Sequence, residues 1–287
     1  MAKGRELKGR IKSVENTRKI TRTMEMVATS KMKRAQDRVV AARPYAKAIA
    51  EVIANLHSPE FADRFPLLRQ PTAVARAAVI LLTSNRGLAG AFNANLLRET
   101  RGLIARLEEQ GATVDLNVVG RKGIGYFRYV GRALVAARTD ITDRPTSDDA
   151  ASLVNEAMDA FARGEVDAVH VVYASFRSAI STPPTVQQIL PVVPPPKAST
   201  QRDFILSPGA DAILGALLPA YVRNAVYRAL VECAAAEQAA RRTAMKNATD
   251  NAGDMLTVLR RTYNRARQAQ ITQEIAEIVG GAAALQG

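Results

Sequence analysis

The sequence predicts an α/β protein in which the N- and C-terminal helices form a long antiparallel coiled coil around an inserted α/β domain. Apolar residues repeat every 3.5 residues near both ends of the chain, no proline follows Pro219, and strand-like and helix-like segments alternate in between. We expect an N-terminal coiled-coil helix over 1–57, an α/β globular domain over 70–206 and a C-terminal coiled-coil helix over 208–285.

The N-terminal helix is predicted by positions spaced alternately four and three residues apart, the period of a coiled coil. We expect a kink at Pro44 and an end at 57–59, His-Ser-Pro. Polar residues interrupt the seam over 18–25, where either charges face solvent or another chain contacts the helix. The seam positions are Leu7, Ile11, Val14, Arg18, Thr21, Glu25, Ala28, Met32, Ala35, Val39, Ala42, Ala46, Ile49, Ile53 and Leu56.

The C-terminal helix is expected to start at Ser207, an N-cap followed by Pro208, and to bend at Pro219. Nothing stops it over 220–280, which corresponds to roughly 90 Å. The seam is expected to change phase near Ile271, from which the isoleucines continue one face at 275 and 278. The earlier seam positions are Tyr227, Val231, Ala234, Gln238, Arg241, Met245, Ala248, Ala252, Met255, Leu259, Thr262, Ala266 and Ala269.

The two terminal helices are expected to pack on each other, because helices in proteins owe most of their stability to the packing of an apolar stripe. They bracket a domain of different pattern, so an antiparallel pairing is the simplest arrangement. Alanine-lined seams let backbones approach closely and bury little area per residue, which favours a slender rod over a thick bundle.

The middle of the chain is expected to form a small Rossmann-like α/β domain, because its apolar runs fit strands covered on both faces. We expect Ser147 to cap its second helix and Gly164 to end it. Further extended segments are expected on both sides of the proline-rich stretch 191–200. The predicted strands cover 77–84, 112–119, 132–137 and 167–176, and the predicted helices cover 93–110 and 148–163.

The net charge of +13 belongs to the two ends of the chain. Residues 1–57 contain 14 Lys and Arg against 5 acids, and residues 220–287 contain 9 against 6. Basic ends are compatible with nucleic acid, anionic lipid or acidic protein. No apolar run reaches the roughly 18 residues of a membrane span and no signal peptide is evident, so we expect a soluble, unsecreted protein.

The sequence contains few candidate catalytic or metal-binding residues. Cys233 is the sole cysteine, which excludes an intramolecular disulfide, and two histidines are too few and too scattered for a zinc site. The stretch TSNRGLAGAFNANL, 83–96, places Gly87 and Gly90 between a strand and a helix, as phosphate sites do. It lacks both GxGxxG and GxxxxGK[ST] spacing, which favours a turn for tight packing. We expect no catalytic residues, metal or cofactor.

Four stretches together resemble the gamma subunit of F-type ATP synthases, of bacterial type, over essentially the whole chain. They are EMVATSKMKRAQ (25–36), TSNRGLAGAFNANL (83–96), EQAARRTAMKNATDNAGDML (237–256) and ARQAQITQEIAEIVGGAAAL (266–285). The resemblance implies a non-catalytic rotor shaft that couples proton flow through a membrane c-ring to cycling of the catalytic beta subunits. Its implied partners are the alpha, beta and epsilon subunits and the c-ring, without nucleic acid, at the cytoplasmic face of the bacterial plasma membrane.

The resemblance also implies contact residues by motif position. Arg267 and Gln268 match contacts to a loop of a catalytic subunit, and Thr272 and Glu274 are their neighbours. Met24 and Lys31 match the same interface between rotor and stator. Ala89 stands where relatives often have cysteine, and with Cys233 alone we expect no thiol switching.

Two alternatives stay open from the sequence. The basic ends are compatible with a coiled-coil nucleic-acid-binding protein, whose binding depends steeply on salt. The glycine-containing turn is compatible with a nucleotide-binding enzyme, whose ligand contacts would centre on 87–90. Neither alternative accounts for an alanine-lined coil of about 90 Å.

Overall fold

The computed structural model describes residues 2–56, 64–193 and 209–286. These residues form two compact units, one of residues 28–241 and one of residues 1–27 with 242–287. Each terminal helix contributes to both units, and the units are described separately below. The division into segments 1–57, 70–206 and 208–285 stays a prediction. The expected cap at Ser207, the expected stop at 57–59 and the segment after 193 lie outside the described residues.

The larger unit contains a five-stranded sheet in the order β3-β2-β1-β4-β5. The first four strands are parallel, and β5 runs antiparallel to β4. Six of the seven residues of β1 are buried, as expected for a central strand covered on both faces. The strands are β1 (Arg76–Leu82), β2 (Thr113–Val119), β3 (Ala136–Arg138), β4 (Ala168–Ala174) and β5 (Pro184–Leu190).

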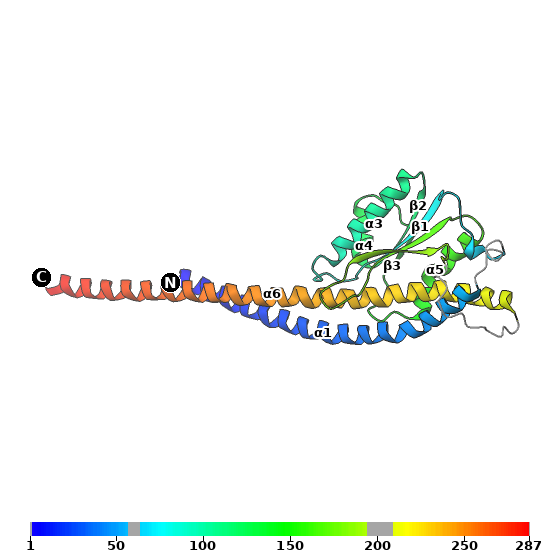
Figure 1. Ribbon diagram of the computed structural model, residues 1–287. Coiled ribbons are helices and arrows are strands. Elements are labelled where there is room, and N and C mark those ends of the chain that lie inside the picture. Colours follow the sequence, from blue (N-terminus) through cyan, green and yellow to red (C-terminus); the bar gives the residue numbers. More distant parts are fainter. Residues whose placement is uncertain (1, 57–63, 194–208, 287) are drawn as a thin grey trace. The chain divides into compact units, whose positions relative to one another are not determined.

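Helices cover both faces of this sheet (Figure 1). Helices α3 and α4, which follow β1 and β2, lie on one face, and α5 with the first half of α6 lies on the other. This is the Rossmann-like arrangement that the sequence predicts. The helices are α1 (Ala2–Leu56), η1 (Pro66–Leu68, 3₁₀), α3 (Phe92–Glu109), α4 (Arg121–Tyr129), α5 (Ser147–Ala162) and α6 (Ala210–Gln286).

The segment 120–131 is the main departure from the predicted α/β domain, because it forms helix α4 where no helix is predicted. Its Gly123 has a packing reason: a Cβ there would lie 2.7 Å from Val118 Cγ1. Helix α5 is capped by Thr146, not by Ser147, since the Thr146 side chain accepts from the Asp149 N–H in a capping box. The predicted end of α5 at Gly164 is confirmed by its left-handed φ of 79°.

Both terminal helices contribute side chains to the core of the larger unit. Ile49 and Ile53 of α1 join the main cluster around the sheet, together with Leu214 and Leu218 of α6. A second cluster lies along the helix pair and contains Met32, Ala35, Val39, Phe176, Val231, Ala235 and Ala239. The alanine-lined seam is therefore confirmed, and the two ends of the chain complete the fold of the α/β domain.

The predicted seam of α1 agrees with the observed burial in this unit. Helix α1 continues through Pro44, and α6 continues through Pro219. The predicted positions that are at most 9% exposed are Ala28, Met32, Ala35, Val39, Ala46, Ile49 and Ile53.

The glycine-containing turn over 83–91 is held by the protein's own side chains. The Ser84 N–H donates to Asn93 Oδ1 at 3.1 Å, and Asn93 Nδ2 donates to Ser84 Oγ at 2.8 Å. Asn85 Nδ2 donates to the Thr139 carbonyl oxygen at 3.1 Å. Because these groups satisfy one another, the turn joins strand to helix by tight packing, the simpler of the two interpretations of its sequence.

Arg241 links this turn to α6. Its guanidinium is 2.7 Å from Glu237 Oε1 and donates to the Gly87 carbonyl oxygen at 3.4 Å. Both side chains of the ion pair are less than one-fifth exposed. Burial raises the pKa of Glu237, while Arg241 opposes that shift. The pair thus holds a carboxylate in a place that would otherwise favour its protonated form.

Replacing Arg241 tests this pair. We expect Arg241→Met to lower the free energy of unfolding at pH 7 by about 3 kcal/mol, because it leaves the Glu237 carboxylate buried without its cation. A carboxyl whose pKa is raised in the folded state binds protons more readily there than in the unfolded chain. The free energy of unfolding of the variant therefore falls as pH rises. The stability that Arg241→Met loses relative to wild type should accordingly be smaller at pH 5 than at pH 7 in urea titrations.

The matched control is the double variant Glu237→Gln with Arg241→Met, which has no carboxylate to protonate. It should recover part of the lost stability and show no such pH-dependent change relative to wild type. A deficit of Arg241→Met that is the same at both pH values would contradict the role given to Glu237.

Candidate partner-binding surfaces

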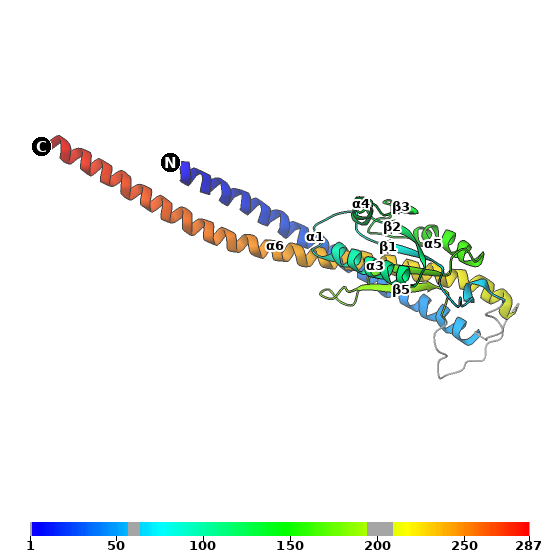
Figure 2. The same cartoon turned by 90° about the horizontal axis from the view of Figure 1, so that it is seen from above.

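The smaller unit is an antiparallel helix pair. Arg260 of α6 donates to Glu15 of α1 at 2.5 Å, and the hydroxyls of Thr249 and Thr21 lie 2.8 Å apart. Position numbers rise along α6 as they fall along α1, which confirms the predicted direction of pairing. Figure 2 shows the two helices alongside each other in this part of the chain.

The polar interruption predicted in α1 consists of residues with different environments. Thr21 is 8% exposed and meets Thr249 within the seam. Glu25 is half-buried and accepts from Arg22 at 3.1 Å, whereas Arg18 is exposed. The interruption is therefore a hydroxyl contact between the helices, with a charge directed to solvent on its N-terminal side.

The seam of α6 changes phase earlier than predicted. Met255 is 54% exposed and Leu256 is 2% exposed, so the buried position lies one residue later than expected. The predicted Thr262 and Ala269 are likewise exposed, and Tyr263 and Gln270 are partly buried in their place. An α-helix has 3.6 residues per turn and drifts from a strict 3.5-residue repeat, so an added step of four restores contact. The prediction of a shift near Ile271 is wrong.

Beyond this seam, every residue from 271 to 281 is exposed. Ile271, Ile275 and Ile278 are 47%, 57% and 72% exposed, so the isoleucine face has no partner among the described residues of this unit. Hydrogen bonds along the helix stabilise it locally, as between Gln270 Nε2 and Glu274 Oε1 at 2.9 Å. This helical tip presents a bare apolar surface.

The residues expected at the interface fall into separate places. Arg267 and Gln268 are exposed in the turns just before the tip, and the Thr272 hydroxyl donates to the Gln268 carbonyl oxygen at 3.0 Å. Met24 is partly buried on α1 of the same unit. Lys31 belongs to the larger unit, where its Nζ is 2.7 Å from Asp143 Oδ2 and lowers the pKa of that carboxyl.

Several apolar side chains on the helix pair are exposed, which the predicted seam pattern does not anticipate. Isolated exposed apolar residues are common, but several on one slender element indicate a surface that another molecule covers. For all of them except Met255, which was predicted in the seam, the signal in the sequence is an apolar residue type away from the predicted seam positions. They are Ile20 (60%), Met26 (64%), Val27 (51%), Met255 (54%) and Val258 (61%).

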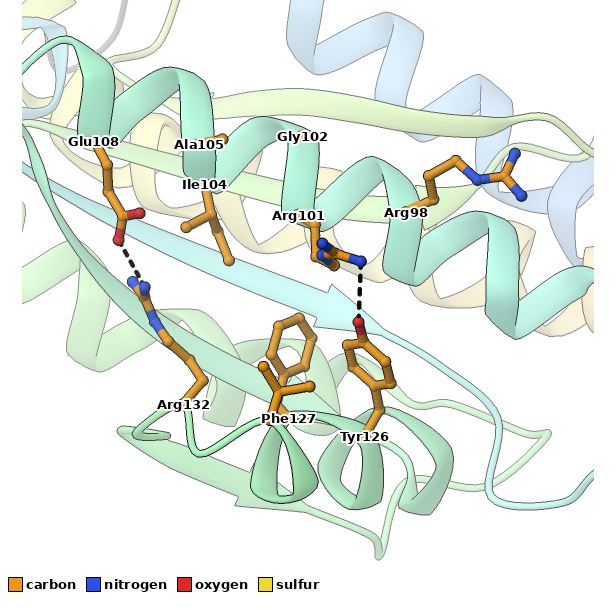
Figure 3. A pocket seen from close by; sticks show the side chains of 10 residues that line it. Arg98, Arg101, Gly102, Ile104, Ala105, Glu108, Tyr126, Phe127 and Arg132 are labelled. Carbon is orange, nitrogen blue, oxygen red and sulfur yellow. Dashed lines mark hydrogen bonds and ion pairs between the residues drawn. The ribbon is translucent and has the colours of Figure 1, made fainter.

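A groove between α3 and α4 is a further feature of the larger unit, with a volume of about 530 Å³ (Figure 3). Ile104 and Phe127 line its apolar part, and Arg101 Nη1 donates to the Tyr126 hydroxyl at 3.3 Å across it. At one end Arg132 is 2.6 Å from Glu108. The groove suits an apolar group that carries a negative charge, and its lining does not include the turn at 87–90.

Cys233 lies in the core beneath β1. Its thiol is fully buried, donates to the Leu82 carbonyl oxygen at 3.7 Å, and has its pKa raised to about 12 by that burial. A thiolate is the reactive form of cysteine, so this side chain acts as a small core residue. No helix among the described residues is both long and apolar enough to span a bilayer.

The contact between Thr21 and Thr249 can be tested by replacement. We expect Thr21→Val to lower the free energy of unfolding by up to about 1 kcal/mol, because it removes the contact with Thr249, whose hydroxyl keeps its hydrogen bond to the Met245 carbonyl oxygen at 2.8 Å. Replacing both threonines with valine should cost less than the sum of the two single replacements, because the same contact is lost only once. Thr23→Val, on the exposed face of the same helix, is the control. Equal losses for Thr21→Val and Thr23→Val in denaturant unfolding would contradict this coupling.

Comparison with known proteins gives one consistent result. The sequence profile of a family described as ATP synthase matches residues 3–285. An ATP synthase gamma chain of Gemmatimonas aurantiaca is 67% identical, with all of both chains covered. One from Frankia casuarinae is 46% identical, over 98% of this chain and 97% of the relative.

Solved structures show the same fold. A chain of the central stalk and c-ring of the Tetrahymena thermophila mitochondrial ATP synthase is 26% identical with a TM-score of 0.62, covering 80% of this chain and 99% of that one. A chain of the Euglena gracilis mitochondrial ATP synthase, from a structure of OSCP, F1 and c-ring, is 19% identical with a TM-score of 0.66. It covers 99% of this chain and 95% of the Euglena chain.

Proposed function

The chain belongs to the family of ATP synthase gamma chains, and from this membership we propose that it is the central rotor shaft of a bacterial F-type ATP synthase. It couples proton flow through a membrane ring to the conformational cycling of catalytic beta subunits. The observation that carries the proposal is the helical tip over 271–281, exposed at every position and apolar along its isoleucine face. A surrounding protein supplies the packing that this helix lacks on its own.

The proposed partners are a ring of alpha and beta subunits, an epsilon subunit and a membrane c-ring. Support comes from the related structures, in which similar chains occur together with F1 and with a c-ring. The exposed apolar residues of the helix pair support a close-fitting partner around the coil. As part of this complex, the chain is proposed to be a peripheral component at the cytoplasmic face of the plasma membrane.

The shaft itself is proposed to be non-catalytic. The turn at 83–91, the position at which a nucleotide would approach a sheet of this topology, is held by internal hydrogen bonds to Asn93 and Thr139. Cys233 is buried with a raised pKa, so it offers no nucleophile. ATP chemistry is accordingly assigned to the beta subunits, and this chain changes their conformation through an asymmetric surface.

The contact residues are proposed from their exposure and position. Arg267 and Gln268 present a cation and an amide just before the apolar tip, which suits recognition of an acidic loop on a beta subunit. Thr272 and Glu274 follow on the exposed tip. Met24 is proposed as a packing contact near the polar interruption.

Lys31 is proposed to contribute to the same rotor and stator interface as a member of an ion pair with Asp143. Its Nζ is 2.7 Å from Asp143, and the two side chains are 37% and 34% exposed. A partner that approaches Lys31 therefore meets a half-exposed ion pair and not a free cation.

Reconstitution tests the proposed function. The full chain mixed with cognate alpha and beta subunits should co-elute with them in size-exclusion chromatography and raise the rate of ATP hydrolysis. The control is a chain truncated after residue 265, which removes the tip and its preceding turns but keeps most of the helix pair. A complex that assembles and hydrolyses ATP at the same rate without the chain would overturn the proposal.

A second test concerns the contact residues. Arg267→Ala with Gln268→Ala should reduce coupled ATP synthesis in membrane vesicles severalfold, because loss of a charge-assisted contact weakens the grip of the shaft. Helix content by circular dichroism should stay the same. The matched control, Arg261→Ala with Asn264→Ala, removes the same kinds of exposed side chain one to two turns earlier. Equal synthesis in wild type and in the first variant would remove Arg267 and Gln268 from the interface.

A further inference from the structure

We propose that a basic pocket between α1, α6 and the loop from β3 to α5 binds a phosphate group. The pocket has a volume of about 210 Å³ and lies entirely within the larger unit. It is lined by Lys31, Arg34, Arg38, Asp143, Arg144 and Gln238. The proposal is independent of the proposed function, because it rests on these side chains alone.

The charges of the pocket do not balance. Four cations meet one carboxylate, Asp143, whose Oδ2 is 2.7 Å from Lys31 Nζ. The buried Glu237 nearby is matched by Arg241 at 2.7 Å. With both acids accounted for, three positive charges remain without a counter-charge from the lining residues, which favours a ligand with more than one negative charge.

The three arginines of the pocket have guanidinium N–H groups that remain available to a ligand. Among the described residues, the hydrogen bonds of the Arg34 guanidinium go to its own helix, 3.4 Å from Ser30 Oγ and 3.5 Å from the Ser30 carbonyl oxygen. Arg38 makes one long hydrogen bond, 3.5 Å, to the Asp143 carbonyl oxygen. Arg144 is exposed, and its guanidinium has no hydrogen bond or ion pair with any described residue. Guanidinium groups recognise phosphate through paired N–H donors.

Gln238 adds a neutral amide donor to the basic residues of the pocket. Its side chain is 4% exposed, lines the pocket, and has no hydrogen-bond partner among residues 2–56, 64–193 and 209–286. The buried side-chain nitrogen and oxygen atoms that lack a partner among the described residues are Arg69 Nε and His170 Nδ1, so the amide of Gln238 still reaches solvent through the pocket. A phosphate oxygen in the pocket could therefore accept from its Nε2. The neighbouring seam positions 234 and 235 are alanines, so the amide stands out as a polar group in an apolar row.

Volume limits the ligand. Pockets for drug-sized molecules are roughly 300–1,000 Å³, and this one is smaller. It accommodates inorganic phosphate, or the phosphate group of a larger molecule whose remainder extends into solvent. Both sources share the chemistry of a tetrahedral oxyanion that carries between one and two negative charges near neutral pH.

The experiment is calorimetric titration of the full chain with inorganic phosphate, pyrophosphate, AMP and adenosine at constant ionic strength in chloride. We expect saturable binding of the phosphate-bearing ligands and none of adenosine. Tighter binding of inorganic phosphate than of AMP would assign the free ion as ligand, and the reverse would assign a nucleotide phosphate. No saturable binding of any phosphate-bearing ligand would overturn the proposal.

Variants make the assignment specific. Arg34→Gln and Arg144→Gln should each weaken binding about tenfold or more, because each removes a charge-assisted donor. Asp143→Asn should strengthen binding, since it removes the negative charge from the pocket. Arg43→Gln, an exposed arginine on the same helix outside the pocket, should change affinity less than about twofold.

Two results would count against the pocket. Equal weakening by Arg43→Gln and Arg144→Gln would show non-specific attraction to a basic helix. Binding of an oligoglutamate peptide in a titration where phosphate does not bind would identify an acidic protein as the ligand class. The substituted arginines at 34 and 144 are exposed, and equal thermal melting of all variants would exclude loss of fold as the cause.

Discussion

Close packing of the two terminal helices is the constraint on which the larger unit depends. Ala35 of α1 and Ala235 and Ala239 of α6 are almost fully buried along the seam, and Ala235 and Ala239 have no exposed surface. Small side chains let two backbones approach, and larger ones would separate them. The same helices then place Ile53 and Leu214 in the core beneath the sheet. A domain encoded in the middle of the chain is thus completed by its two ends.

Polar residues enter the seam where the helices meet the loops of the α/β domain. The ion pair of Arg241 and Glu237 holds the turn after β1, and Lys31 holds Asp143 in the loop after β3. Desolvation offsets much of the attraction within the buried pair of Arg241 and Glu237, and the pair of Lys31 and Asp143 is half-exposed. We therefore expect both pairs to position these loops more than to add net stability. Gln238, between these pairs and without a partner of its own, fits neither apolar packing nor pairing. Its position follows from the seam, and its chemistry is directed to the pocket.

The sequence allowed most of the fold to be predicted, because seam positions and buried strands leave regular apolar patterns. It misplaced the phase of α6, since both Met255 and Leu256 are apolar and only three-dimensional packing decides which is buried. Helix α4 was missed because glycines weaken helix propensity, and the close approach to Val118 that requires Gly123 is a tertiary contact. The pocket around Gln238 joins residues more than 200 positions apart, so no local pattern signals it.

The exposed tip brings packing and function together. Each hydrogen bond along the tip, such as Gln270 to Glu274, contributes only about 0.2–0.5 kcal/mol to a helix. These contributions are small beside the apolar packing that stabilises most protein helices. Such a segment is stabilised by packing against a surrounding protein. Its isoleucines make apolar contacts, which, unlike hydrogen bonds, have no preferred direction. Directional groups are concentrated just before it, at Arg267 and Gln268. A rotor requires this separation, because an apolar face can slide within a bearing while a few polar contacts transmit torque.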